Sequence, residues 1–208
     1  MDSLKDRAMA LLRERGMARL KDFTELNIPA SILRRLVADD LVESPARGIY
    51  RLAGIEMDFS SENTAVALFR TDGVLCLASA ADFHQLVNDF DGAEIYVAVP
   101  PTLRDRDPVS GIHLVRWVPD NLSRDFGVGE ADLCGIKVKV TTPERTVVDL
   151  LRYQRRLPDG VRYASEALYS LVERDECRFD ELMRLAARFK VDEEVASVVR
   201  AVSRSSRM

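Results

Sequence analysis

The sequence predicts a mixed α/β (α+β) protein with two domains, and three observations lead to this fold class. The chain has 208 residues, which is long for one small module and comfortable for two. Residues 1–55 combine helical apolar spacing with one short hairpin pattern, whereas residues 56–208 mix strand-like and helix-like runs. Hydrophobic residues make up 47% of the chain and charged residues 31%, a composition that supports a buried core.

The N-terminal residues predict three helices in succession. Apolar side chains recur at helical spacing over residues 4–12, with Ser3 as the expected N-cap and Gly16 as the stop. A second short helix is expected over residues 19–26. A proline then breaks the chain and begins a third helix over residues 30–38.

The third helix is expected to have one apolar face and one polar, basic face. The outward positions are Ser31, Arg34, Arg35 and Ala38. Arginine can bridge the O6 and N7 atoms of guanine or clamp phosphates, and serine can donate to either kind of group. Two short apolar runs flanking a Pro/Gly turn follow over residues 41–52, which predicts a β-hairpin with Arg47 at its tip.

Three helices followed by such a hairpin are the order of a winged helix-turn-helix, which predicts binding to double-stranded DNA. The expected DNA-contacting residues are Arg19, Lys21, Ser31, Arg34, Arg35, Arg47 and Arg51. Taken alone, two arginines on one helix face are usually only a solvated surface, and winged helices also serve as protein-binding modules. The net charge of −4 looks wrong for a DNA-binding protein, but residues 1–54 hold ten Lys/Arg against eight Asp/Glu.

A change of composition around residues 54–61 predicts the domain boundary, so residues 56–208 are expected to form a second, mixed α/β domain. It would have a small sheet and a helical C-terminal part. Strands are expected at 74–77, 94–99, 111–117 and 136–140, and helices at 63–69, 79–87, 143–151 and over most of 161–203, with Ser79 as one cap and Asp159, Asp180 and Asp192 at breaks or caps. Thr142 is the expected N-cap of the helix that begins with Pro143, and Asp149 can pair with Arg145 one turn earlier.

The sequence offers little catalytic chemistry, so we expect no enzyme, cofactor or metal. Neither a glycine-rich phosphate loop nor a G-x-S-x-G elbow occurs. The three cysteines are far apart, and the two histidines, His84 and His113, are expected to be packed or surface residues. Asp132 before Lys137 and Lys139 loosely resembles a nuclease pattern, but such spacing is common by chance.

The chain is expected to be soluble and cytoplasmic, without contact with a membrane. No stretch approaches the ~20 apolar residues that a membrane span needs. The first residues are charged and lack the apolar core of a signal peptide.

Four segments together resemble one protein family. They are residues 47–52 (RGIYRL), 74–81 (VLCLASAA), 96–100 (YVAVP) and 140–150 (VTTPERTVVDL), of which the last is the most specific. By their order and spacing, residues 5–175 resemble the AbiEi antitoxins of the abortive-infection type IV toxin–antitoxin systems. The chain departs from the family where Asp39 and Asp40 replace a frequent glycine after the recognition helix, and where Gln85 replaces the glycine of His-Gly-Leu.

The resemblance implies a winged helix joined to a C-terminal α/β domain. Such proteins bind inverted repeats in their own promoter and repress it, and their C-terminal domain supports antitoxin action and cooperative binding on DNA. The resemblance also implies a nucleotidyltransferase-like toxin, which the antitoxin opposes without forming a stable complex. The recognition helix maps onto residues 30–38 and the wing onto residues 41–52.

Two other hypotheses stay open. The chain could be a stand-alone winged-helix regulator whose C-terminal domain senses a ligand or only self-associates, because some proteins that look like this family have no toxin beside them. It could also be an enzyme with a DNA-targeting domain. A neighbouring toxin-like gene would separate the antitoxin from the stand-alone regulator.

Overall fold

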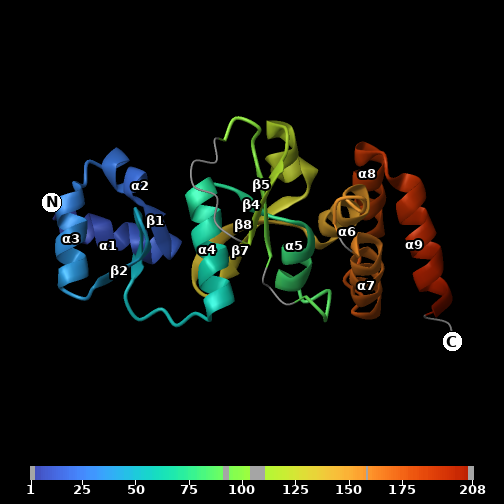
Figure 1. Ribbon diagram of the computed structural model, residues 1–208, viewed down its shortest axis with the longest axis horizontal. Helices are drawn as coiled ribbons and strands as arrows, with labels where there is room; N and C mark the ends of the chain where they lie inside the picture. Colours follow the sequence, from blue (N-terminus) through green and yellow to red (C-terminus); the bar gives the residue numbers. More distant parts are fainter. Residues whose placement is uncertain (1–2, 91–93, 104–110, 158, 206–208) are drawn as a thin grey trace. The chain divides into compact units, whose positions relative to one another are not determined.

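The computed structural model describes residues 3–90, 94–103, 111–157 and 159–205. Over these residues the chain forms nine α-helices and two small sheets, one of three strands and one of five, so the predicted mixed α/β class is confirmed (Figure 1). The chain divides into two compact units. Unit 1 comprises residues 1–73 and 130–138, and unit 2 comprises residues 74–129 and 139–208.

Unit 1 contains the predicted domain of residues 1–55 together with one further helix and a short returning segment. Its elements are α1 (Leu4–Arg15), β1 (Met17–Arg19), α2 (Leu20–Glu25), α3 (Ala30–Ala38), β2 (Val42–Ala46), β3 (Ile49–Leu52) and α4 (Phe59–Thr71). The strands form an antiparallel sheet of order β1-β3-β2. The boundary at residue 55 itself stays a prediction.

The local signals in the sequence explain the ends of α1. The Ser3 hydroxyl accepts from the backbone N–H of Asp6, whose carboxylate accepts in turn from the backbone N–H of Ser3, so the helix begins with a capping box. Gly16 ends the helix with φ +76°, and its N–H donates to the carbonyl of Leu12 at 2.8 Å. Ala8, Leu11 and Leu12 are buried, as their spacing predicts.

The three helices and one face of the three-stranded sheet enclose a core. Leu12, Phe23, Leu33 and Leu36 are among its largest side chains, and each is at most 1% exposed. Tyr50 of β3 packs edge-on against Phe23, with ring centroids 5.8 Å apart. The sheet contains a third strand, β1, that the sequence does not predict. A strand of only three residues without alternation leaves no pattern to recognise. β2 continues through Pro45, which an edge strand tolerates.

Unit 2 contains a sheet and a group of helices. Its elements are β4 (Val74–Leu75), α5 (Leu77–Phe83), β5 (Ile95–Val99), β6 (Ile112–Arg116), η1 (Pro119–Leu122), η2 (Arg124–Phe126), β7 (Val128–Leu133), β8 (Ile136–Thr141), α6 (Pro143–Arg152), α7 (Gly160–Glu173), α8 (Phe179–Phe189) and α9 (Asp192–Ser205). The sheet order is β6-β5-β4-β8-β7, with β4 antiparallel to β5 and parallel to β8, and β5 parallel to β6. The outer part of the β7–β8 hairpin, residues 130–138, groups with unit 1.

The helices of unit 2 share one core with the inner strands. Helices α6–α9 gather together, and α5 contacts both α6 and β5 (Figure 1). Trp117, Leu150, Leu168 and Leu185 are almost fully buried in this core. Within the described residues, no helix is long and apolar enough to cross a membrane.

Two predictions for unit 2 were wrong. Ser79 is not the cap of a helix over 79–87, because α5 begins earlier and ends at Phe83. The Ser79 hydroxyl instead donates to the carbonyl of Glu94 and accepts from the N–H of Tyr96, at 3.1 and 2.9 Å, and so joins α5 to the start of β5. The strand expected at 74–77 stops at Leu75 because the chain turns into α5 there. Asp180 lies within the first turn of α8, and Asp192 begins α9.

Candidate nucleic-acid interface

Helix α3 presents the polar face that its sequence predicts. Ser31, Arg34, Arg35 and Ala38 are all exposed. On the opposite side, Leu33 and Leu36 are buried in the core of unit 1, with Ile32 and Val37 packed partly against it. The apolar contacts therefore hold the helix so that both guanidinium groups point to solvent.

The turn before α3 is fixed by backbone contacts. Asn27 takes the left-handed conformation with φ +57°, which asparagine tolerates better than most residues. The N–H of Ile28 donates to the carbonyl of Phe23 at 2.9 Å. Arg7 of α1 donates to the carbonyl of Leu26 at 2.6 Å. These bonds fix the turn between α2 and α3. The two helices and this turn are the helix-turn-helix part of the unit.

The wing tip lies beside the start of α2. The N–H of Leu20 donates to the carbonyl of Gly48 at 2.8 Å, and Gly48 has φ +76° in the turn between β2 and β3. Lys21 and Arg47 adjoin the two ends of this hydrogen bond, and both are exposed. The start of α2, with Lys21, and the wing tip, with Arg47, are therefore neighbours in the structure.

Arg19 and Arg51 have different surroundings from the other predicted cations. The Arg51 side chain is 11% exposed and pairs with Glu43 at 2.8 Å and with Glu62 at 3.0 Å. The Arg19 side chain is 20% exposed and pairs with Asp22 and Asp72 at 3.2 and 3.4 Å. Because carboxylates engage these two guanidinium groups, the exposed candidate interface consists of Lys21, Ser31, Arg34, Arg35 and Arg47.

The charges on α3 are not evenly distributed. The last turn is followed by Asp39 and Asp40, both exposed, and the Asp39 carboxylate lies 4.0 Å from the Lys5 ammonium group. An acidic C-terminal end repels phosphates, whereas the N-terminal end carries the positive end of the helix dipole. The N-terminal end of α3 therefore favours anions more than the C-terminal end does, and Arg35, in the last turn, lies close in sequence to the two acidic residues.

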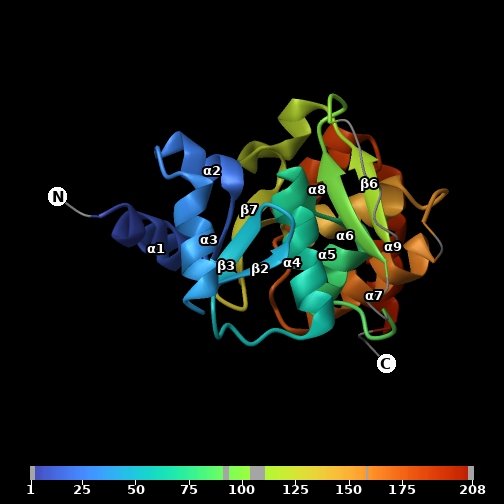
Figure 2. The ribbon, with the colours of Figure 1, turned by 60° about the vertical axis from the view of Figure 1, so that its left-hand side comes forward.

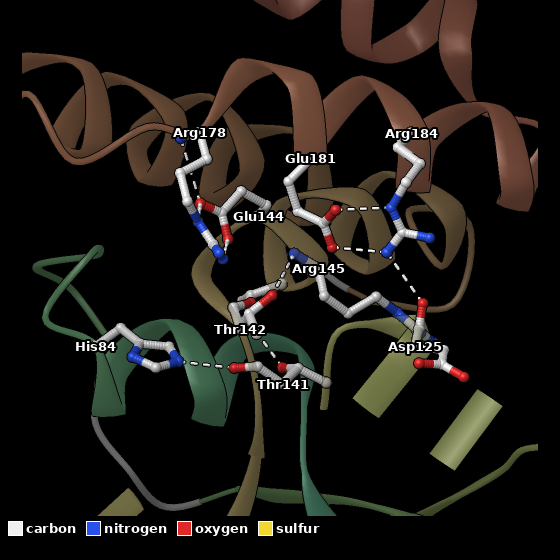
Figure 3. Close-up of polar contacts among 10 residues, drawn as sticks. His84, Asp125, Thr141, Thr142, Glu144, Arg145, Arg178, Glu181 and Arg184 are labelled. Carbon is white, nitrogen blue, oxygen red and sulfur yellow. Dashed lines mark hydrogen bonds and ion pairs between the residues drawn. The ribbon is translucent and has the colours of Figure 1, made fainter. Parts of the chain in front are cut away.

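A second cluster of polar side chains surrounds the start of α6 in unit 2 (Figure 3). Glu144, only 1% exposed, accepts two hydrogen bonds from the Arg178 guanidinium at 2.9 and 2.8 Å. Burial alone would raise the pKa of Glu144, but the bonds from Arg178 bring that pKa below its ordinary value. The Arg184 guanidinium pairs with Glu181 and also donates to the carbonyl of Asp125 at 3.0 Å.

Both histidines and Asp132 have structural partners. His84 Nε2 lies 2.7 Å from the carbonyl oxygen of Thr141, and burial lowers the pKa of this imidazole. His113 stacks on Tyr96 and contacts Glu94. The Asp132 carboxylate accepts from the N–H of Gly135 at 2.8 Å in the β7–β8 turn.

Comparisons with known proteins add little. No protein-family model matches the chain, and no curated protein matches it. Among solved structures, the chain is similar to that of the RV2827C protein from Mycobacterium tuberculosis, with 19% sequence identity and a TM-score of 0.48. The match covers 90% of this chain and 72% of the mycobacterial chain. So distant a likeness assigns no function.

Proposed function

We propose that unit 1 is a DNA-binding winged helix-turn-helix and that the protein is a transcriptional repressor. One contrast carries the proposal. Among the described residues, Lys21, Arg34, Arg35 and Arg47 are exposed and have no ion-pair partner, whereas Arg19 and Arg51 are paired. Exposed guanidinium groups on a helix and at an adjacent wing tip suit base edges and phosphates, respectively.

The finer proposal is an autoregulating antitoxin. It is supported by the resemblance of residues 47–52, 74–81, 96–100 and 140–150 to AbiEi antitoxins. On this proposal the protein binds inverted repeats in its own promoter, self-associates on that DNA, and opposes a nucleotidyltransferase-like toxin without a stable complex. The proposed function includes neither a catalytic step nor a cofactor.

Fluorescence anisotropy tests the DNA-binding proposal directly. The purified protein is titrated onto labelled duplex DNA from immediately upstream of its own gene, with scrambled duplex as competitor, at several salt concentrations. We expect a preference for the upstream DNA and an affinity that falls steeply with salt, because phosphate contacts release counterions. Equal affinity for both duplexes would leave no basis for a specific repressor, and no binding at moderate salt would indicate a protein-binding module.

The antitoxin proposal needs a second experiment. The adjacent gene is expressed under a controlled promoter in cells with and without this protein. Rescue of growth supports the antitoxin, and its retention when Arg34 and Arg35 are replaced by alanine would separate toxin neutralisation from repression. Specific DNA binding without any toxic neighbour would support a stand-alone regulator.

A further inference from the structure

The three-stranded sheet of unit 1 is covered on both faces. Residues paired across antiparallel strands point to the same face, and the register pairs Ala18 with Tyr50 and Val42 with Leu52. These four side chains belong to the three-helix core or pack against it. The other face therefore needs a different cover.

That other face contains Met17, Arg19, Ile49 and Arg51, because the register pairs Met17 with Arg51 and Arg19 with Ile49. Met17 and Ile49 are at most 3% exposed, yet neither belongs to the three-helix core. Helix α4 contacts all three strands, and Figure 2 shows it beside β2 and β3. Its buried residues include Ala65 and Leu68, so α4 covers the second face.

Two ion pairs attach α4 to this face, one near each of its ends. Near the N-terminal end, Glu62 forms an ion pair with Arg51, which also donates to Glu43 of β2 and so links the helix to both strands of the wing. At the C-terminal end, Asp72 pairs with Arg19, which also donates to the carbonyl of Phe69 at 3.5 Å. A guanidinium group that is largely buried and bonded by two carboxylates has little freedom to move.

We infer that Arg51 and Arg19 are positioning residues, and that with Glu62 and Asp72 they form a clamp by which α4 sets the place of the wing. The inference rests on the proposed DNA binding. The clamp holds the base of β3, and the tip of the same hairpin carries Arg47, the expected phosphate contact. Helix α4 is thus part of the DNA-binding machinery, although it lies beyond the first 55 residues.

The test combines the clamp variant Glu62→Gln with Arg47→Ala in a double-mutant cycle on the full chain. Glutamine retains an acceptor oxygen but not the charge, so the variant weakens the clamp and leaves its packing in place. In the wild-type background we expect Arg47→Ala to weaken binding about tenfold and to reduce the salt slope by about 1. In the Glu62→Gln background, Arg47→Ala should weaken binding less than about twofold, because the misplaced wing has already lost its contact.

A matched control is Glu56→Gln, which removes an exposed carboxylate from the segment that leads to α4. It should leave both DNA affinity and the effect of Arg47→Ala unchanged. Asp72→Asn releases the other end of the helix and should act like Glu62→Gln. Its backbone has φ +53°, a conformation that asparagine accepts. Thermal melts by circular dichroism check that each variant is folded at the temperature of the titration.

The outcomes separate the clamp from the proposed function. Wild-type protein that fails to bind DNA would refute the function itself. If the wild type binds and Arg47→Ala weakens it equally in both backgrounds, DNA binding stands and the clamp inference is wrong. Loss of the Arg47 effect in both clamp variants, but not in Glu56→Gln, supports positioning, because a general loss of stability would not remove the coupling selectively.

Discussion

The Nε atom of Arg145 donates to Oδ2 of Asp149 at 2.6 Å, and both side chains are completely buried. The pair lies one turn apart on α6, as the sequence predicts. The guanidinium group is held between the rings of Trp117 and Phe189, 4.5 and 3.9 Å from their centroids, and it also donates to the carbonyl of Phe126. This guanidinium group therefore joins α6 to α8, to η2 and to the segment before η1.

Replacing one member of this pair should destabilise the fold strongly, whereas replacing both members with apolar residues should not. Asp149→Leu leaves the Arg145 charge buried without its partner, and we expect a loss of about 3–5 kcal/mol in the free energy of unfolding. The double variant Arg145→Met/Asp149→Leu should recover most of that loss. Urea unfolding followed by Trp117 fluorescence measures both, since Trp117 is the single tryptophan and is buried in unit 2. A double variant as unstable as Asp149→Leu would contradict this account.

His84 should make the stability of unit 2 depend on pH. Burial lowers the pKa of His84, against the opposing effects of the Thr141 carbonyl and Glu144. The unfolded chain therefore takes up the proton first, at a pKa near 6.5. The stabilising contribution is complete above about pH 6.5 and is lost as the pH falls from there through the lower pKa of the folded state.

We therefore expect the urea midpoint, followed by Trp117 fluorescence, to decrease between about pH 7.5 and pH 5.5. His84→Gln keeps a donor for the Thr141 carbonyl but does not titrate, and it should flatten the decrease. His113→Gln replaces the other histidine, an exposed residue of β6, and is the matched control. An unchanged slope in His84→Gln would show that other groups cause the decrease.

Gly16 is expected to be intolerant of any side chain. A Cβ atom built there would lie 2.3 Å from the carbonyl oxygen of Gly135 and 2.7 Å from Cα of Ile136, which are backbone atoms of unit 1 and cannot simply rotate away. Gly54 shares the positive φ, at +80° against +76°, but has no heavy atom within 4 Å of such a Cβ. The two glycines therefore separate backbone strain from collision.

Gly54→Ala should cost about 1–2 kcal/mol, the price of a left-handed conformation for a residue with a side chain. Gly16→Ala should lower the free energy of unfolding by about 1–3 kcal/mol more than Gly54→Ala does, because the added Cβ also collides with the backbone. Chemical denaturation measures the free energy of unfolding of the two variants, and hydrogen exchange over α1 to β3 shows whether the loss lies in unit 1. Equal losses would mean that the β7–β8 turn does not pack against Gly16 in solution.

Local signals in the sequence were enough for the elements that carry the proposed interface. Helix α3 has the expected bounds, because a proline precedes it and its apolar spacing is regular. Helix α6 begins at Pro143 with Thr142 as its cap, for the same kind of reason. The outward face of α3 follows from these bounds alone, so the positions of Arg34 and Arg35 could be predicted.

Contacts between distant residues could not be predicted in this way. The ion pair of Arg51 with Glu62 on α4 could not be predicted, because Glu62 lies beyond the expected boundary at residue 55. Arg19 pairs with Asp72, more than fifty residues later. Strand β1 was missed because it depends on pairing with β3 and not on any pattern of its own. Charge counts cannot reveal which cations are already engaged.

The arginines of α3 and the wing should differ in what they contribute to DNA binding. Arg34 and Arg35 lie on the outward face of α3, where a bidentate contact with guanine provides about 1–3 kcal/mol of discrimination. Arg34→Ala and Arg35→Ala should therefore weaken binding to the upstream duplex more than binding to scrambled duplex. Arg47→Ala should weaken both alike, because phosphates carry no direct sequence information.

The anisotropy titrations on upstream and scrambled DNA measure this difference as a ratio of affinities, read at one fixed salt concentration. Arg200→Ala removes an exposed arginine from α9 of unit 2 and is the matched control for the loss of one positive charge. It should leave the ratio unchanged. If Arg34→Ala and Arg35→Ala reduce affinity for the two duplexes by the same factor as Arg47→Ala, then α3 contacts only the DNA backbone. Sequence would then have to be read elsewhere or through the shape of the duplex.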